Sequence, residues 1–189
     1  IAASWMQVFY TSGPAITVYP DNDTASQMGQ DKVYWENYYA GSGPQSAYTV
    51  NLKYWPVRHG YLSARASYLH RAYVTLNPAR HTENALELVP VASEQWYDIL
   101  KQEQLLPVFT IDLTAGKSFD LKEIIRTAGA DLFLHVGIGV NNILNNQNMQ
   151  VSGYQQLRFD YATRQPERFP NKYRYGYGRT WYANVSLQF

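Results

Sequence analysis

The stretch GRTWYANVSLQF at residues 178–189 decides the fold of this chain. Counted back from the last residue, its side chains alternate between apolar and polar with a period of two residues. The apolar set is Phe189, Leu187, Val185, Ala183 and Trp181, and the polar set is Gln188, Ser186, Asn184, Tyr182 and Thr180. This pattern predicts a β-strand with one apolar face and one polar face, and the sequence closes on an apolar aromatic residue.

The composition narrows the class of protein. A chain of 189 residues with 46% hydrophobic residues can bury a core as one domain. It has no Cys and a formal charge of only +1, so neither a disulfide framework nor a basic nucleic-acid surface is indicated. The 17 Tyr and 5 Trp are amphipathic aromatics, which suit interfaces between apolar and wet surroundings.

The hydrophobic residues are spread in alternate positions rather than in long runs. No run approaches the roughly 20 residues of a spanning helix, and His135 interrupts the best one. Membrane barrel strands hide their hydrophobicity in alternation, so this absence does not exclude a membrane. The sequence begins at Ile1 with neither an initiator Met nor a signal segment, which predicts processing or a longer parent polypeptide.

Five further strands are expected upstream of the last one. Alternation and β-favouring residues place them at 1–10, 46–55, 61–73, 109–119 and 132–141. The connections alternate between long (11–44, 78–106 and 145–177) and short (57–60 and 120–130). The second long connection should contain a helix that begins at the N-cap Ser93 and covers 94–104.

This sorting of loop lengths predicts an all-β, antiparallel transmembrane barrel with short periplasmic turns and long extracellular loops. The residues expected to touch lipid are Leu187, Val185, Leu134, Val136, Ile111 and Leu113. About eight strands is the smallest barrel that side chains can fill, and open edges in lipid leave backbone groups unpaired. We therefore expect residues 1–189 to be the last portion, roughly six strands, of a larger barrel.

The last third of the chain resembles a known family. The run LFLHVGIGVNNILNNQNMQVSGYQQLRFDYATRQPERFPNKYRYGYGRTWYANVSLQF contains an Asn-Asn-hydrophobic turn at 141–144, a GYxQLRFD segment at 153–160 and a FPxKYxYxYGRTxYxNxSLxF ending. These features, with NYYAGSGPQSAY from Asn37 and LNPARHTE from Leu76, are similar to the C-terminal end of TonB-dependent outer-membrane receptors of the Bacteroidetes type. One departure is His81, where relatives tend to carry a second Arg. The resemblance implies a barrel of about 22 strands, whose plug domain and earlier strands are not in this sequence.

The resemblance implies a transporter and no enzyme. In that family a scarce nutrient (a metal chelate, vitamin, peptide or glycan) binds outer loops and plug, and the TonB complex pulls on the plug to open the lumen. The implied partners are outer-membrane lipid, the rest of the barrel with its plug, the TonB complex through that plug, and the barrel-assembly machinery, which reads a terminal aromatic residue, here Phe189. The implied location is the bacterial outer membrane, with the C-terminus in the periplasm and no cofactor or nucleic-acid partner.

Candidate substrate contacts are polar groups that face a wet cavity or lie on outer loops. They are Arg71, Tyr154, Arg158 and Asp160. The competing reading is structural: Arg65 and Asp112 would pair with neighbouring strands or the plug, and the Tyr-rich loops would fold on one another. Two other functions also stay open: a SusC-like importer working with a surface lipoprotein, and a structural or adhesive barrel without transport.

The sequence contains only weak indications of a metal site or of a hydrolase active site. Asp21, Asn22, Asp23 and Asp31 offer oxygen ligands for calcium, but their spacing lacks the Gly and bidentate Glu of a recognised loop. The four His residues show no pair at zinc spacing, and no GxSxG motif is present. We therefore expect neither a metal site nor an active site.

Overall fold

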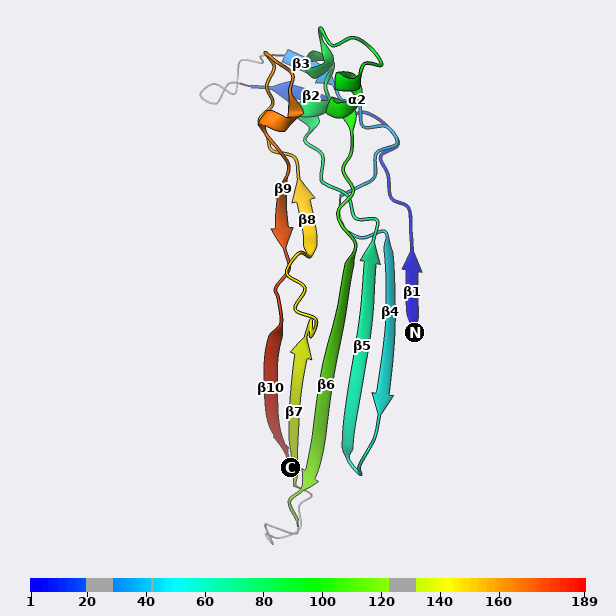
Figure 1. Cartoon of the computed structure of the whole chain (residues 1–189), viewed down its shortest axis with the longest axis vertical. Helices are drawn as coiled ribbons and strands as arrows, with labels where there is room; N and C mark the ends of the chain where they lie inside the picture. Colours follow the sequence, from blue (N-terminus) through cyan, green and yellow to red (C-terminus); the bar gives the residue numbers. More distant parts are fainter. Residues whose placement is uncertain (20–28, 42, 123–131) are drawn as a thin grey trace.

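The computed structural model describes residues 1–19, 29–41, 43–122 and 132–189. Its main feature is a six-stranded antiparallel sheet in which the strands follow chain order, β1-β4-β5-β6-β7-β10 (Figure 1). The strands are β1 (Ala2–Trp5), β4 (Ser46–Tyr54), β5 (Gly60–His70), β6 (Val108–Asp120), β7 (Phe133–Asn141) and β10 (Thr180–Gln188). The predicted antiparallel, mostly β architecture is confirmed.

The register keeps the apolar positions of five strands in phase. One row of directly opposed residues runs Leu52, Ala64, Leu113, Val140 and Trp181. The next row runs Lys53, Ser63, Thr114, Gly139 and Tyr182. Because successive residues of a strand point to opposite sides, the sheet has a continuous apolar face, which contains the first row, and a polar face, which contains the second.

Side chains on the polar face satisfy one another across strands. The Ser63 hydroxyl donates to Asn51 Oδ1 at 2.7 Å. His135 lies between two partners, with Ser118 Oγ 2.7 Å from Nδ1 and Gln188 Oε1 3.0 Å from Nε2. Since an amide oxygen can only accept, Nε2 carries the proton and Nδ1 accepts from the Ser118 hydroxyl.

The apolar face, in contrast, is uncovered in this chain. Leu52 is 70% exposed, Val185 68% and Ile138 59%. Aromatic residues lie toward both ends of this face: Tyr48, Tyr68 and Phe109 toward the head, and Tyr54 and Phe119 toward the opposite end. The sheet therefore leaves much of the apolar surface that its alternation creates exposed, although Val140 on this face is 5% exposed.

The three long connections gather at one end of the sheet and form what we call the head (Figure 1). They hold two hairpins and short helices: β2 (Ala15–Val18) with β3 (Gly29–Lys32), β8 (Gln150–Tyr154) with β9 (Lys172–Tyr175), η1 (Pro78–His81), α1 (Glu83–Leu86), α2 (Glu94–Leu100) and η2 (Pro166–Arg168). The turn after β4 and the C-terminus lie at the opposite end (Figure 1). The expectation that the long connections share one end is met in the described residues.

None of the helices in the described part of the chain is long and apolar enough to cross a membrane.

Several predicted boundaries are wrong, each for a local reason. The first strand stops at Trp5 rather than residue 10: Met6 N still bonds Gln45 O (2.9 Å) in the β1–β4 register, but Val8 then bonds the side-chain amide of Gln45 instead of strand backbone. The strand expected at 61–73 ends at His70, since Arg71 adopts a φ of 59°, incompatible with an extended strand. The predicted helix begins as expected after Ser93 but ends at Leu100, and the two hairpins in the long connections were not predicted.

The sheet is open at both edges in the described residues. β10 pairs only with β7, and β1 pairs only with β4, covering Ser46 to Thr49. The remaining backbone groups on these edges have no strand partner here. Open edges of this kind are positions where further strands can add.

Candidate functional site

The head has its own hydrophobic core. Its centre is a cluster from the second and third long connections, with Trp96 and Leu100 packed against it: Ala85, Leu86, Val89, Ile99 and Phe159. Ile99 is 2% exposed, so α2 is anchored by its apolar side. This anchoring leaves the opposite side of α2, with its charged residues, free to line a surface.

Glutamine side chains join the head's connections because each amide bonds both the N–H and the C=O of one distant residue. The Gln45 amide donates to Val8 O (2.9 Å) and accepts from Val8 N (3.3 Å). Gln102 does the same with Tyr39, at 2.6 and 2.8 Å. Each pair of bonds imitates a rung of a β-ladder, which fixes segments that are far apart in sequence.

The side-chain amide of Gln155 likewise holds the LNPARHTE segment. Its Oε1 accepts from Asn77 N (2.8 Å) and lies 2.9 Å from His81 Nε2, so the imidazole must donate from Nε2. His81 is fully buried, its Nδ1 has no partner among the described residues, and its ring meets Tyr38 edge to face. Burial lowers the pKa of His81 to about 4, with the nearby Arg80 cation acting in the same direction.

Two buried arginines connect the second and third connections through carbonyl groups. Arg80 donates to Phe169 O and Pro166 O, both at 3.1 Å. Arg164 donates to Tyr161 O and Asn84 O and lies 3.8 Å from Glu87. Both guanidinium groups therefore hold the loops together, with Arg164 Nε as the one fully buried nitrogen of the two groups that lacks a partner among the described residues.

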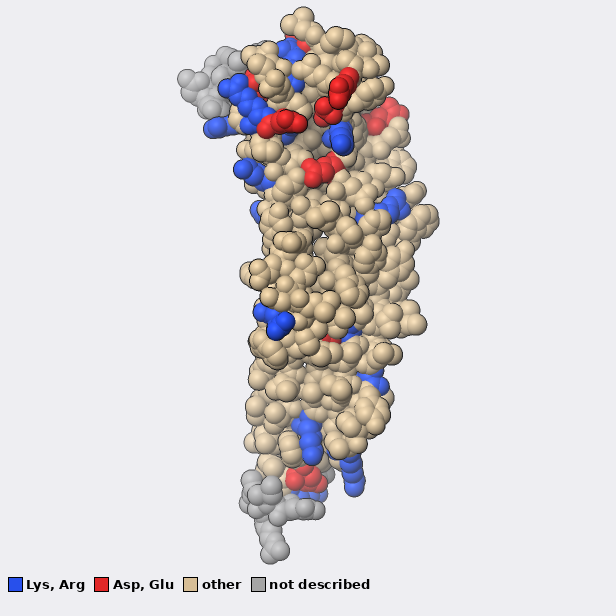
Figure 2. All heavy atoms as spheres, in the orientation of Figure 1, with Lys and Arg blue, Asp and Glu red and all other residues tan. Residues whose placement is uncertain are grey.

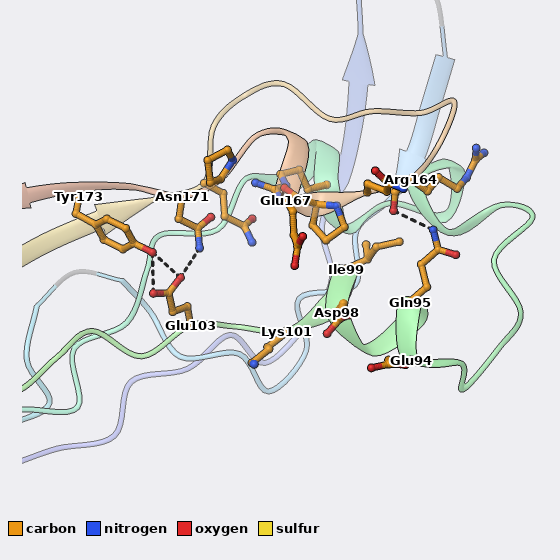
Figure 3. A pocket seen from close by; sticks show the side chains of 15 residues that line it. Glu94, Gln95, Asp98, Ile99, Lys101, Glu103, Arg164, Glu167, Asn171 and Tyr173 are labelled. Atoms are coloured by element: carbon orange, nitrogen blue, oxygen red, sulfur yellow. Dashed lines mark hydrogen bonds between the residues drawn. The ribbon is translucent and has the colours of Figure 1, made fainter.

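A groove of about 800 Å³ lies between α2 with its following segment and residues 164–173 (Figure 3). Glu94, Asp98 and Lys101 come from the first wall, and Glu167 comes from the second (Figure 3). On the face seen in Figure 2, the carboxylates gather mostly on the head, while the middle of the sheet carries few charged side chains. The lining of the groove thus combines four carboxylates, Glu94, Asp98, Glu103 and Glu167, with the cations Arg80, Lys101 and Arg164.

One end of the groove is closed by a hydrogen-bonded cluster. Glu103 accepts from Asn171 Nδ2 (2.7 Å) and from the Tyr173 hydroxyl (2.7 and 2.9 Å), as Figure 3 shows. Burial, with the Glu103 carboxylate, raises the pKa of Tyr173 to about 12. The tyrosine therefore stays a donor at any physiological pH, and it ties the second connection to β9.

The carboxylates along the groove's rim, unlike that of Glu103, make no hydrogen bonds to the described residues. Glu94 and Asp98 stand one turn apart on α2, so they share a face of the helix. In the described ranges, neither they nor Glu167 has a hydrogen-bond or ion-pair partner, and all three are exposed. Charged groups in this state can be neutralised by a ligand without breaking any existing contact.

The sequence-predicted residues lie elsewhere, since the groove's lining does not include them. Arg71 sits at the boundary between sheet and head, 5.9 Å from the Trp5 ring and 5.6 Å from the Tyr39 ring. The hydrogen bond that Arg71 donates to the side chain of Tyr73 raises the pKa of Arg71 further. Tyr154 is 45% exposed at the end of β8, bridged to Thr75.

Arg158 and Asp160 share a loop but have opposite environments. Arg158 is exposed, whereas Asp160 is buried and accepts from Thr163, Ala162 and Arg168, the last at 2.6 Å. These bonds hold the pKa of Asp160 well below its usual range. All its acceptor capacity is used within the loop, so its position favours a structural role.

The terminal Phe189 is 93% exposed at the far end of β10, one residue beyond the strand. Its side chain lies far from the head (Figure 1). The expected role of Phe189 as an assembly signal stays a prediction.

The groove residues escaped prediction from sequence. The one available signal was the pair Glu94 and Asp98, four residues apart after the N-cap Ser93. Nothing in the sequence indicates that Glu103 meets Tyr173 or that Glu167 lies across from α2. These relations depend on how the loops pack.

For metals, no group of three or more His, Asp or Glu residues with suitable geometry occurs among the described residues. Asp21, Asn22 and Asp23 lie outside the described residues. Asp31, the remaining member of that set, accepts from Asn84 N at 3.0 Å.

Comparisons of the chain with protein-family models, with curated proteins and with solved structures found no match.

Proposed function

We propose that this chain is the C-terminal barrel portion of an outer-membrane, TonB-dependent transporter that binds a scarce nutrient at the cell surface and imports it. In this proposal the sheet forms part of the barrel wall, its polar face lines the lumen, and the head is part of the extracellular loops. The observation that carries the proposal is the apolar face, which stays in register across five strands and remains uncovered.

An apolar surface of this extent suits lipid better than water. Monomeric soluble proteins rarely expose contiguous apolar patches above a few hundred Å². Membrane barrels carry an outward apolar band flanked by aromatic residues, and the apolar face has aromatic residues toward both ends. A hollow of about 490 Å³ in this face, bounded by Leu62, Leu113, Ile138 and Trp181, offers an apolar seat for an acyl chain.

The open edges support a larger assembly. Within lipid, each unpaired backbone N–H or C=O would cost several kcal/mol. β1 and β10 would have to pair with strands outside residues 1–189 to avoid this cost. A meander with every connection between neighbouring strands, as seen here, is the arrangement that continues into a closed barrel.

The head supports the ligand-binding half of the proposal. Its core and its buried arginines hold three connections in a fixed arrangement, and the groove presents unpaired polar groups. Such sites on loops held by a rigid scaffold are common places for ligand recognition.

Single cysteines test the topology, because this chain has no Cys of its own. In cells expressing the full polypeptide, a membrane-impermeant maleimide should label Leu157→Cys in the head on intact cells. The matched Arg58→Cys, in the turn after β4, should react only after the outer membrane is permeabilised. Labelling of Arg58→Cys alone on intact cells would contradict this orientation.

Uptake tests the transport step. Cells with and without the full polypeptide would be given a labelled ferric siderophore, cobalamin, an oligopeptide or maltotriose, with and without a protonophore. The proposal predicts that accumulation of one of these classes depends on both the protein and the proton gradient. If no class shows that dependence, the chain forms a barrel without transport.

A further inference from the structure

We propose that the groove between α2 and residues 164–173 binds a cationic peptide, one that presents Lys or Arg side chains to the groove's rim and a carbonyl to its floor. This inference names the ligand class of the proposed function, and it rests on that function for the exposure of the head to the outside medium.

The groove's available charge is negative. Its rim holds the unpartnered carboxylates Glu94, Asp98 and Glu167. Lys101 is the one cation of the described lining residues that makes no hydrogen bond or ion pair with them. Arg80 and Arg164 also border the groove, but both donate to loop carbonyls and are buried, at 4% and 9% exposed. A ligand at the rim therefore meets mainly carboxylates, which form charge-assisted hydrogen bonds with ammonium and guanidinium groups.

The floor carries a separate signal, a buried donor left open. Gln155 is 7% exposed, and both bonds to its Oε1 come from the head's interior, from Asn77 N and His81 Nε2. Its Nε2 makes no hydrogen bond to the described residues and keeps some exposure to solvent, and Gln155 lines the groove. Buried amide groups nearly always find an acceptor, and a ligand carbonyl would supply one.

Rim and floor together discriminate between ligand classes. A peptide with basic side chains satisfies both, since its backbone carbonyl meets Gln155 Nε2 while its cations meet the rim. An anionic ligand would bring like charges beside Glu94, Asp98 and Glu167. A neutral sugar would leave these carboxylates without counter-charge, and the described lining offers it one aromatic ring, Tyr173, whose hydroxyl already serves Glu103.

Calorimetry on the full polypeptide in detergent tests this inference, with trilysine, triglutamate and maltotriose as probes. Trilysine should bind most tightly, and its affinity should fall with added salt. The triple variant Glu94→Gln/Asp98→Asn/Glu167→Gln should weaken trilysine binding about tenfold or more, from the modest worth of each exposed ion pair. Glu36→Gln removes an exposed carboxylate outside the groove and should leave the affinity unchanged.

Lys101→Met should strengthen trilysine binding, by roughly two- to fivefold. Misfolding would weaken binding, so it could not explain this result. Tighter binding of triglutamate or maltotriose, or trilysine binding that neither groove variant changes, would overturn the inference. Because the measurement uses purified protein, its failure is distinct from failure of the membrane topology, which the cysteine labelling reports.

Discussion

The head and the sheet follow opposite rules of burial within one chain. The head encloses apolar side chains such as Val74 (0% exposed) and Ile99 (2%) behind polar loops, as a water-soluble domain does. The sheet instead satisfies polar groups on one face by hydrogen bonds. On its other face, Leu52 is 70% exposed and Val185 is 68% exposed. The proposed function accounts for this difference by two solvents, water around the head and lipid beside the sheet.

The largest expected effect comes from truncating the head's core. Ile99→Ala should lower the free energy of unfolding of the head by about 2–5 kcal/mol, because it removes buried methyl groups and leaves a cavity. The same truncation on the apolar face, Ile138→Ala, should cost less, since lipid chains can fill the space. Denaturant unfolding of the reconstituted full polypeptide, followed by hydrogen exchange at residues 94–100 and 133–141, would separate the two. Equal losses at both positions would contradict the proposed contrast.

Charge should discriminate between the two faces of the sheet. Leu113→Arg on the apolar face should destabilise the protein in lipid by about 2–4 kcal/mol if it lies near the midplane. Thr114→Arg, the next residue, points to the polar face and should cost far less. Unfolding in lipid vesicles measures both variants. A larger loss for Thr114→Arg would mean that the faces are assigned the wrong way round.

The head should lose stability in acid. Its buried His81 has a pKa of about 4, below the ordinary 6.5, so the unfolded chain binds a proton between these values and the folded chain does not. The contribution is complete above about pH 6.5 and declines as the pH falls toward 4, by about 3 kcal/mol in total. Hydrogen exchange of residues 74–86 against pH would show it. His81→Gln should remove this pH dependence, and an unchanged slope in that variant would contradict it.

The smallest expected effect concerns the helix start in the head. Ser93 Oγ accepts from Trp96 N at 3.2 Å, so Ser93→Ala should destabilise α2 by about 1 kcal/mol. Faster hydrogen exchange should be confined to residues 94–100. Ser12→Ala, an exposed serine in the first connection, is the matched control and should leave that exchange unchanged.

The sequence predicts the sheet much better than the head. The strands were found at 46–55, 109–119 and the C-terminus because a two-residue alternation is a local signal, read without knowing the neighbours. The hairpins β2–β3 and β8–β9 are four or five residues per strand and sit between turn residues, which gives little periodicity to detect.

The groove was beyond prediction for a related reason. Glu103 meets Tyr173 across 70 residues of chain, and Asn77 meets Gln155 across 78. No spacing rule connects such positions. Conversely, Asp160 looked like a substrate contact because it is charged and lies in a loop, yet its acceptors are filled by Thr163 and Arg168, which only the folded loop reveals.

Spin labels along β10 would report whether one face of the sheet contacts lipid and the other contacts water. Single cysteines at positions 181 to 188 of the reconstituted full polypeptide would each carry a nitroxide, and its accessibility to oxygen and to a polar nickel complex would be measured. We expect a two-residue period, with oxygen accessibility highest at Trp181, Ala183, Val185 and Leu187 and nickel accessibility highest at Tyr182, Asn184, Ser186 and Gln188. The inverse pattern, or accessibility to the nickel complex on both faces, would contradict the lipid-facing sheet.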